Sequence, residues 1–203
     1  ILFPFLMILI TYLDAFSQDI NFSHLNHSKL FINPGFAGSG KVANLIVSHR
    51  NLSPTGFGNY LTYRASYNQH LEGINGGLGI QFIRDNQGNG TIHRTYFSGM
   101  YSYQIMVHQN LYIYPALEVK YAIYSLNTKD LVFPSMFDRN TWSITPQMPL
   151  ESLYKSANYL EFNSGVILRS INQYLRTYRD FTVGIALHHL NKPVSLLDDE
   201  QQI

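Results

Sequence analysis

The sequence predicts an all-β protein, an antiparallel transmembrane β-barrel of the outer-membrane type with about seven strands present. Three observations support this prediction: an apolar run at the front of the chain, segments in which apolar and polar residues alternate, and connections that alternate in length. No later stretch approaches the roughly 18 consecutive apolar residues of a membrane-spanning helix, so a helical membrane protein is not expected.

The first residues are expected to direct export. Residues 1–13 form an uncharged apolar run, and the small residues Ala15 and Ser17 mark a cleavage site before Gln18. This arrangement is typical of a secretory signal peptide, although a buried N-terminal strand or helix is the alternative. Because the chain begins inside the apolar run, we expect residues 1–17 to be a partial signal peptide. Residues 18–41 are irregular and polar, and are expected to face the periplasm or to plug the barrel lumen.

The composition narrows the possible partners. The 203 residues carry a net charge of +1, with 13% charged residues, 15 Tyr, 13 Phe and no Cys. A chain without Cys forms neither disulfides nor thiolate metal sites. No basic field large enough for nucleic acid is visible. We therefore expect the partners to be outer-membrane lipid and other proteins, and no nucleic acid.

Seven segments are predicted to be strands, at 42–50, 57–70, 76–84, 91–105, 111–125, 158–170 and 178–189. In 111–125 the odd positions are mostly apolar, while Glu118 and Lys120 fall on the even side. Similar alternation occurs in 57–70, 91–105 and 158–170, so one face suits lipid and the other a polar lumen. The charged residues expected to fill and rigidify this lumen are Arg64, Arg94, Glu118, Lys120, Glu161 and Arg169. A selectivity lining for a pore is the alternative role.

The connections between these segments differ in length. Short ones are expected near 71–75, 107–110 and 171–176, and longer ones near 51–55, 85–90 and 127–157. Short periplasmic turns and longer outer loops are typical of outer-membrane barrels, so 42–203 is predicted to be the barrel and 127–157 its long extracellular loop. Because bacterial barrels use an even number of strands, the barrel is expected to be incomplete. A soluble β-sandwich, whose strands also alternate, is the other fold considered.

One motif suggests nucleotide chemistry that its context argues against. Residues 35–41 match the GxxxxGK pattern of a phosphate-binding loop. That loop requires a preceding strand, a following helix and a Ser or Thr after the Lys. Here Asn33-Pro34 precedes the motif, Val42 follows it, and the next segment is predicted to be a strand. No nucleotide is expected to bind.

The histidines also give no convincing metal site. His188 and His189 are adjacent, and neighbours on a strand point to opposite faces, so they do not share one ion without a bulge. His24 and His27 could share a helical turn, but only Asp19 lies near them at ligand spacing. Ser48 and His49 are neighbours and so face apart, and Ser98 shares a face with Arg94 but with no His, so we expect no enzyme, metal or cofactor.

Seven short sequence blocks, taken in order, resemble the PorP/SprF family of type IX secretion system membrane proteins. They are Gln18-Asp19 with Phe22-Ser23, Asn33-Pro34-Gly35-Phe36-Ala37-Gly38, His49-Arg50-Asn51 before Pro54, Ala65-Ser66-Tyr67, Gly76-Gly77-Leu78-Gly79-Ile80, Tyr101-Ser102-Tyr103, and 183–193. Gly35 stands where the family usually has Ala, and Leu52-Ser53 replaces a Gln-Trp pair. Family members are usually longer, which agrees with an incomplete barrel.

The resemblance implies an outer-membrane barrel of Bacteroidota that works with the type IX export apparatus. In several members such a barrel retains a secreted adhesin or other cargo during export or gliding motility. The motif positions, expected to be structural, are Asn33, Pro34, Gly35, Phe36, Ala37, Gly38, Arg50, Asn51, Gly76, Gly77, His189 and Pro193.

The candidate partner contacts lie in the 127–157 loop, at Phe133, Met136, Phe137 and Trp142. A solvent-exposed loop rarely holds such residues unless they pack or meet a partner, and self-packing over the barrel mouth is the alternative. The predicted function is therefore to dock partner proteins for type IX export. A passive porin or small-molecule channel and a secreted soluble β-sandwich are the alternatives.

Overall fold

The computed structural model describes residues 29–40, 42–52, 60–88, 91–127, 137–138, 143–144, 154–170 and 181–191. The helical elements are α2 (Lys29–Ile32) and the 3-10 turns η2 (Pro34–Phe36) and η3 (Glu72–Ile74). The strands are β1 (Asn44–Leu52), β2 (Tyr60–Leu71), β3 (Gly76–Gln87), β4 (Ile92–Tyr103), β5 (Ile105–His108), β6 (Leu111–Asn127), β7 (Phe137–Asp138), β8 (Ser143–Ile144), β9 (Tyr154–Ser170) and β10 (Phe181–Leu187).

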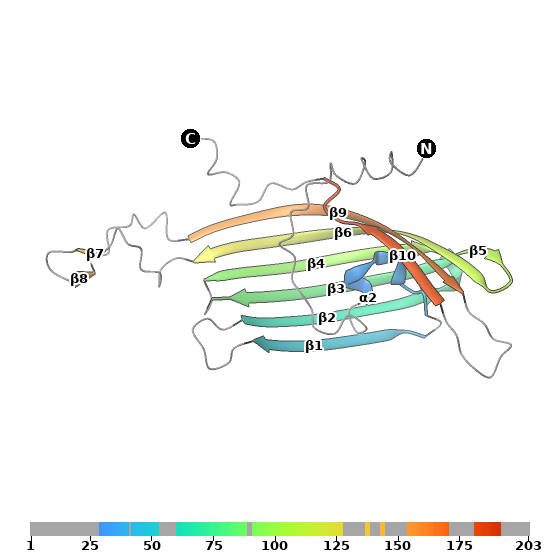
Figure 1. Cartoon of the computed structure of the whole chain (residues 1–203), viewed down its shortest axis with the longest axis horizontal. Helices are drawn as coiled ribbons and strands as arrows, with labels where there is room; N and C mark the ends of the chain where they lie inside the picture. Colours follow the sequence, from blue (N-terminus) through green and yellow to red (C-terminus); the bar gives the residue numbers. More distant parts are fainter. Residues whose placement is uncertain are drawn as a thin grey trace, which may run out of the picture.

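The main sheet is antiparallel and follows the chain in the order β1-β2-β3-β4-β6-β9-β10, while β5 pairs with the start of β6. The sheet curls, so that β9 and β10 turn over the concave side (Figure 1). It is open within the described residues, because β1 and β10 stand at the two ends of the order. The predicted all-β fold, part of an antiparallel barrel wall, is confirmed. The described strands form one curled layer, so the β-sandwich alternative does not hold for them.

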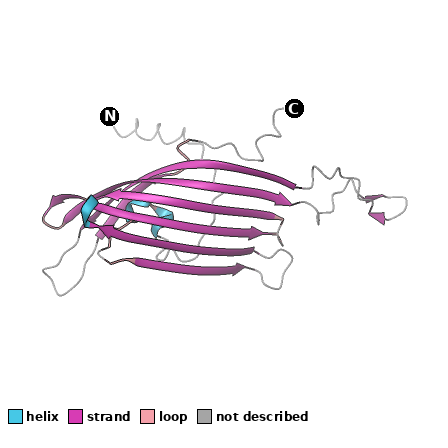
Figure 2. Cartoon of the chain, turned by 180° about the vertical axis from the view of Figure 1, so that it is seen from behind, coloured by secondary structure: helices cyan, strands magenta, loops and turns pink. Residues whose placement is uncertain are grey.

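The segment α2–η2 lies on the concave side of the sheet, close to β10 (Figure 1). Viewed from behind, the curved layer of strands lies in front of it (Figure 2). η2 begins with Asn33 as its N-cap and Pro34 at its first position, a residue whose fixed φ suits a helix start. Residues 35–40 therefore lead from a short turn to strand β1, whereas a phosphate-binding loop leads from a strand into a helix.

The predicted longer connection at 85–90 is wrong. β3 continues to Gln87 and β4 begins at Ile92, so only residues 88–91 join the two strands. Asp85 and Asn86 are typical turn residues, but here they and Gln87 stay in the ladder because their side chains find partners. Asp85 accepts hydrogen bonds from Thr62 and Gln87, and Asn86 bonds His93 across the strand pair.

Other boundaries also differ by up to four residues, and the connection predicted to be short near 171–176 spans residues 171–180, so that prediction is wrong as well. The segment 91–105 is interrupted at Gln104, where β4 ends and the short β5 begins. β6 and β9 are longer than predicted, so the connection between them is 128–153, which contains the small β7–β8 hairpin. No helix in the described part of the chain is long and apolar enough to cross a membrane.

Candidate functional site

The convex, outer face of the sheet is apolar and exposed. In β6, Leu117 is 64% exposed, while Glu118 beside it is 3% exposed, which reverses the pattern of a soluble protein. Large apolar side chains are likewise exposed on the other wall strands, including Val47, Tyr63, Phe82, Phe97, Leu160 and Ile185. A soluble monomer rarely exposes a contiguous apolar patch beyond a few hundred Å². Such an exposed apolar outer face is typical of the wall of a membrane β-barrel.

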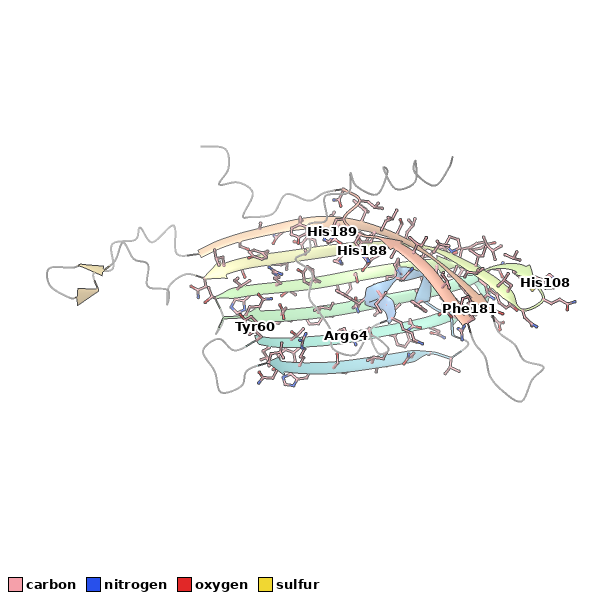
Figure 3. The ribbon with its side chains drawn as sticks, in the orientation of Figure 1. Tyr60, Arg64, His108, Phe181, His188 and His189 are labelled. Carbon is pink, nitrogen blue, oxygen red and sulfur yellow. The ribbon has the colours of Figure 1, made fainter. Side chains whose placement is uncertain are left out.

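The outward-facing apolar positions of the wall form a band about as tall as the hydrocarbon core of a bilayer, and this set of positions is called the apolar band. On β6 the outward positions from Leu111 to Ile123 are all apolar. At about 3.3 Å per residue they cover roughly 40 Å along the strand. A tilt of about 40° reduces this to roughly 30 Å across the membrane. Exposed, outward-facing aromatic residues lie toward both ends of the wall, with Tyr63 on β2 toward the end that carries the 128–153 connection and Phe181 at the other end (Figure 3), where aromatic girdles meet the headgroups.

The inner face is polar, and its residues Glu118, Lys120 and Glu161 have polar partners. Lys120 Nζ lies 2.8 Å from Glu161 Oε1, and His189 Nε2 lies 3.5 Å from Glu161 Oε2. The Asn163 amide donates to Glu118 Oε2 at 2.9 Å and accepts from the His189 backbone N–H at 2.8 Å. Buried charges require such partners because their desolvation is costly. This network ties β6, β9 and the residues after β10 together.

A second polar cluster lies nearer the end of the wall that carries the 128–153 connection. Asp85 accepts from Thr62 Oγ1 and from Gln87 Nε2, each at 2.6 Å. The Arg94 guanidinium lies 5.2 Å from the centre of the Tyr124 ring. The predicted lumen residues Arg64, Arg94, Glu118, Lys120, Glu161 and Arg169 thus all lie on strands of the wall, and their neighbours in register place them on its inner face.

Asn33 attaches the N-terminal segment to this inner face. Its Nδ2 donates to the Val166 carbonyl at 3.3 Å and to the Ile185 carbonyl at 3.0 Å. Its Oδ1 accepts the Gly35 backbone N–H at 2.8 Å. A side-chain amide offers both donors and an acceptor, which this position requires. One residue therefore joins η2 to two neighbouring wall strands, β9 and β10.

The residues after η2 fit closely against β3 and β4. Gly38 has φ +61°, and a Cβ on either Gly38 or Gly77 would overlap the backbone of the other residue. Ser102 Oγ donates to the Ala37 carbonyl, and Arg169 Nη1 donates to the Ser39 carbonyl at 2.5 Å. Glycines inside strands often mark a close backbone approach, and here they make room for residues 37–38.

The structure brings some predicted motif residues together and separates others. Asn33, Pro34, Gly35, Phe36, Ala37 and Gly38 lie in one segment, and its residues 37–38 pack on Gly77 and Gly79 of β3, whereas Gly76 faces Ser102 of β4. Arg50 and Asn51 lie on the edge strand β1, outside this contact, and His189 joins the Glu161 network. Phe137 lies in β7, and nothing is described of its side chain. Phe133, Met136, Trp142 and Pro193 lie outside the described residues.

The sequence predicted no contact role for three residues here, although Ser102 and Gly184 lie in blocks that resemble the family. A Cβ on Gly165 would overlap the Asn33 side chain, and one on Gly184 would crowd Ile167 and the Val166 carbonyl. Ser102 is fully buried and bonds Ala37. Glycines within strand patterns were the available indication for the first two.

The described residues contain no group of three or more His, Asp or Glu side chains placed to hold a metal ion. His188 and His189 lie at the end of β10 (Figure 3) and have different partners. His188 Nε2 lies 3.3 Å from the Ile32 carbonyl, whereas His189 faces Glu161. Their geometry suits packing of the inner face.

A curled antiparallel wall with a lipid-type outer face and a polar inner face defines a membrane protein of the β-barrel class. The family model described as type IX secretion system membrane protein PorP/SprF matches residues 15–203. The chain belongs to this family and is therefore a membrane protein associated with type IX secretion. No curated protein and no solved structure matches the chain at a significant level.

Proposed function

We propose that this chain is an outer-membrane, non-enzymatic component of type IX secretion that docks or retains secreted cargo, such as a surface adhesin, and supports export or gliding motility. It reaches that membrane through a signal peptide to which residues 1–17 belong, and residues 42–203 form part of the barrel. One observation carries the proposal: residues 29–40 occupy the concave side of the wall, where a passive pore needs open space.

Hydrogen bonds attach this segment to the wall at two points. Asn33 bonds β9 and β10, and Ser39 receives a hydrogen bond from Arg169 of β9. Between them, Ala37 is buried and bonded by Ser102 of β4. Because residues 29–40 occupy the inner face, we assign partner binding to the loops. The proposed contacts are Phe133, Met136, Phe137 and Trp142 in the 127–157 loop.

A passive porin is the second candidate, and the polar inner face favours it. Arg64, Glu118 and Glu161 are buried there and resemble the lumen lining of a channel. They are packed against other side chains, however, and Glu118 and Glu161 have hydrogen-bond partners in Asn163 and Lys120. Packed and paired charges support a filled interior rather than an open path for ions.

Conductance and cargo retention together test the proposal. The full-length protein in liposomes should give no stable open channel, whereas a porin would conduct steadily and contradict the docking function.

In cells, Trp142→Ala and Phe133→Ala should lower the amount of surface-retained cargo severalfold with unchanged barrel levels. Asn89→Ala, in the short connection between β3 and β4, is the matched control and should leave retention unchanged. Equal retention in all three variants would contradict the assigned loop contacts.

A further inference from the structure

The charged side chains of the wall are divided unevenly between its inner and outer faces. The carboxylates of the described wall strands, Asp85, Glu118 and Glu161, are all buried on the inner face. Among the Lys and Arg residues of the wall whose side chains are described, only Arg84 is exposed and points outward. Its neighbours along β3, Ile83 and Asp85, are buried on the inner face, so strand alternation fixes its direction.

Arg84 stands at the border of the apolar band. The row across the outer face just below it consists of Phe82, Phe97 and Tyr121 in register. The row just above it contains Asn86 and His93, whose side chains bond each other at 2.8 Å. Since one row is apolar and the next is polar, Arg84 lies where hydrocarbon gives way to headgroups.

The neighbours of Arg84 in its own row are hydrogen-bond donors. Tyr63 on β2 and Thr95 on β4 are its partners in register, and His49 follows Tyr63 with ring centres 4.9 Å apart. Side chains opposite each other in a sheet are close enough to share a ligand. The described part of this outer face contains no carboxylate to neutralise Arg84. Guanidinium and hydroxyl groups together match the geometry and charge of a phosphate.

We propose that Arg84, Tyr63 and Thr95 form a binding site for the anionic phosphate of a membrane-lipid headgroup, at the end of the wall that carries the 128–153 connection. The occupant is a lipid and not a free anion, because the site is continuous with the lipid-facing surface immediately below it. Binding holds the wall at a fixed height in the membrane.

The test measures lipid association with the full-length protein in vesicles of phosphatidylcholine that contain phosphatidylglycerol. The wild-type protein should prefer phosphatidylglycerol, and Arg84→Gln should lower this preference about fivefold, the effect of one cation near an anionic surface. Arg84→Lys should keep most of the preference, and Tyr63→Phe, an isosteric change, should reduce it by a smaller factor. Lys29→Gln removes a positive charge from α2, away from the outer face, and should change nothing.

Several results would overturn the site. An unchanged preference in Arg84→Gln, or an equal loss in Lys29→Gln, would show that Arg84 does not select the lipid. Complete displacement of the lipid by excess inorganic phosphate would make the ligand a free anion. Heat-modifiable gel mobility verifies that each variant has folded. Because neither cargo nor conductance is measured, this inference can fail while the proposed docking function stands.

Discussion

Asn33 shows how one side chain connects distant parts of this chain. Its amide reaches backbone groups on β9 and β10 and also caps η2. Aspartate would lose the donor that both carbonyls need, and alanine would leave both carbonyls and the Gly35 N–H without this partner. The position is therefore chemically specific to a carboxamide.

Asn33→Ala should destabilise the protein by about 2–3 kcal/mol, since a typical protein hydrogen bond contributes about 1 kcal/mol and three are lost. Urea unfolding of the vesicle-inserted protein would measure this change. The same variant should also become more sensitive to proteolysis within residues 29–40.

Asn158→Ala is the control for Asn33→Ala, because Asn158 is exposed on β9. Its free energy of unfolding should stay within about 0.5 kcal/mol of the wild-type value. Similar stability of the two variants would contradict the role of Asn33 as an anchor.

The residues of strand β3 change in size along its length, according to which part of the chain packs against them. Its first residues, Gly76 and Gly77, are buried, and Gly77 lies against Gly38 of the N-terminal segment. Further along, Ile83 and Asp85 fill the inner face while Phe82 and Arg84 point outward. The strand thus combines a docking surface for residues 37–38 with an ordinary barrel wall.

Gly77→Ala should cost about 3 kcal/mol or more, because the added Cβ would overlap backbone that does not move without displacing residues 37–38. Thermal or urea unfolding would measure the loss.

Gly99→Ala on β4 is the matched control for Gly77→Ala, since nothing lies within 4 Å of a Cβ there. Alanine in a strand is favoured over glycine by about 0.5–1 kcal/mol, so this variant should be as stable as the wild type or slightly more stable. Equal losses in both variants would show that the Gly38–Gly77 contact is not tight.

At the scale of the whole molecule, the described sheet is a wall whose polarity is reversed relative to that of a soluble protein. Its outer face exposes Leu117, Val119 and Tyr121, and its buried residues include Glu118 and Glu161. Exposing apolar side chains to water has a free-energy cost, and lipid that covers them removes this cost. We therefore expect the sheet to be stable where its apolar side faces lipid.

Val119→Arg, in the middle of the apolar band, should cost about 2–4 kcal/mol in a bilayer, the effect of a cation near the midplane. Asn158→Arg, in the same outer row as Arg84, should cost about 0–1 kcal/mol because it lies at the interface. Folding titrations into phosphatidylcholine vesicles would measure both values. A similar cost at the two positions would contradict the placement of the membrane.

The sequence by itself determined the strands and the direction in which their side chains point. Alternation has a period of two residues, so the apolar side of 111–125 and the inward position of Glu118 and Lys120 follow from local pattern. The family resemblance likewise rests on short words that can be read without a structure, and the match over residues 15–203 confirms it.

Only the tertiary structure decided which groups the motif residues contact and where some strands end. Asn33 and Ile185 are far apart in sequence, and no local pattern relates an amide to a carbonyl that distant. The polar run at Asp85 suggested a loop because a single strand does not reveal that Thr62 and His93 stand opposite as partners. Long-range pairing and close packing depend on the curvature of the whole sheet, which arises only when all the strands are assembled.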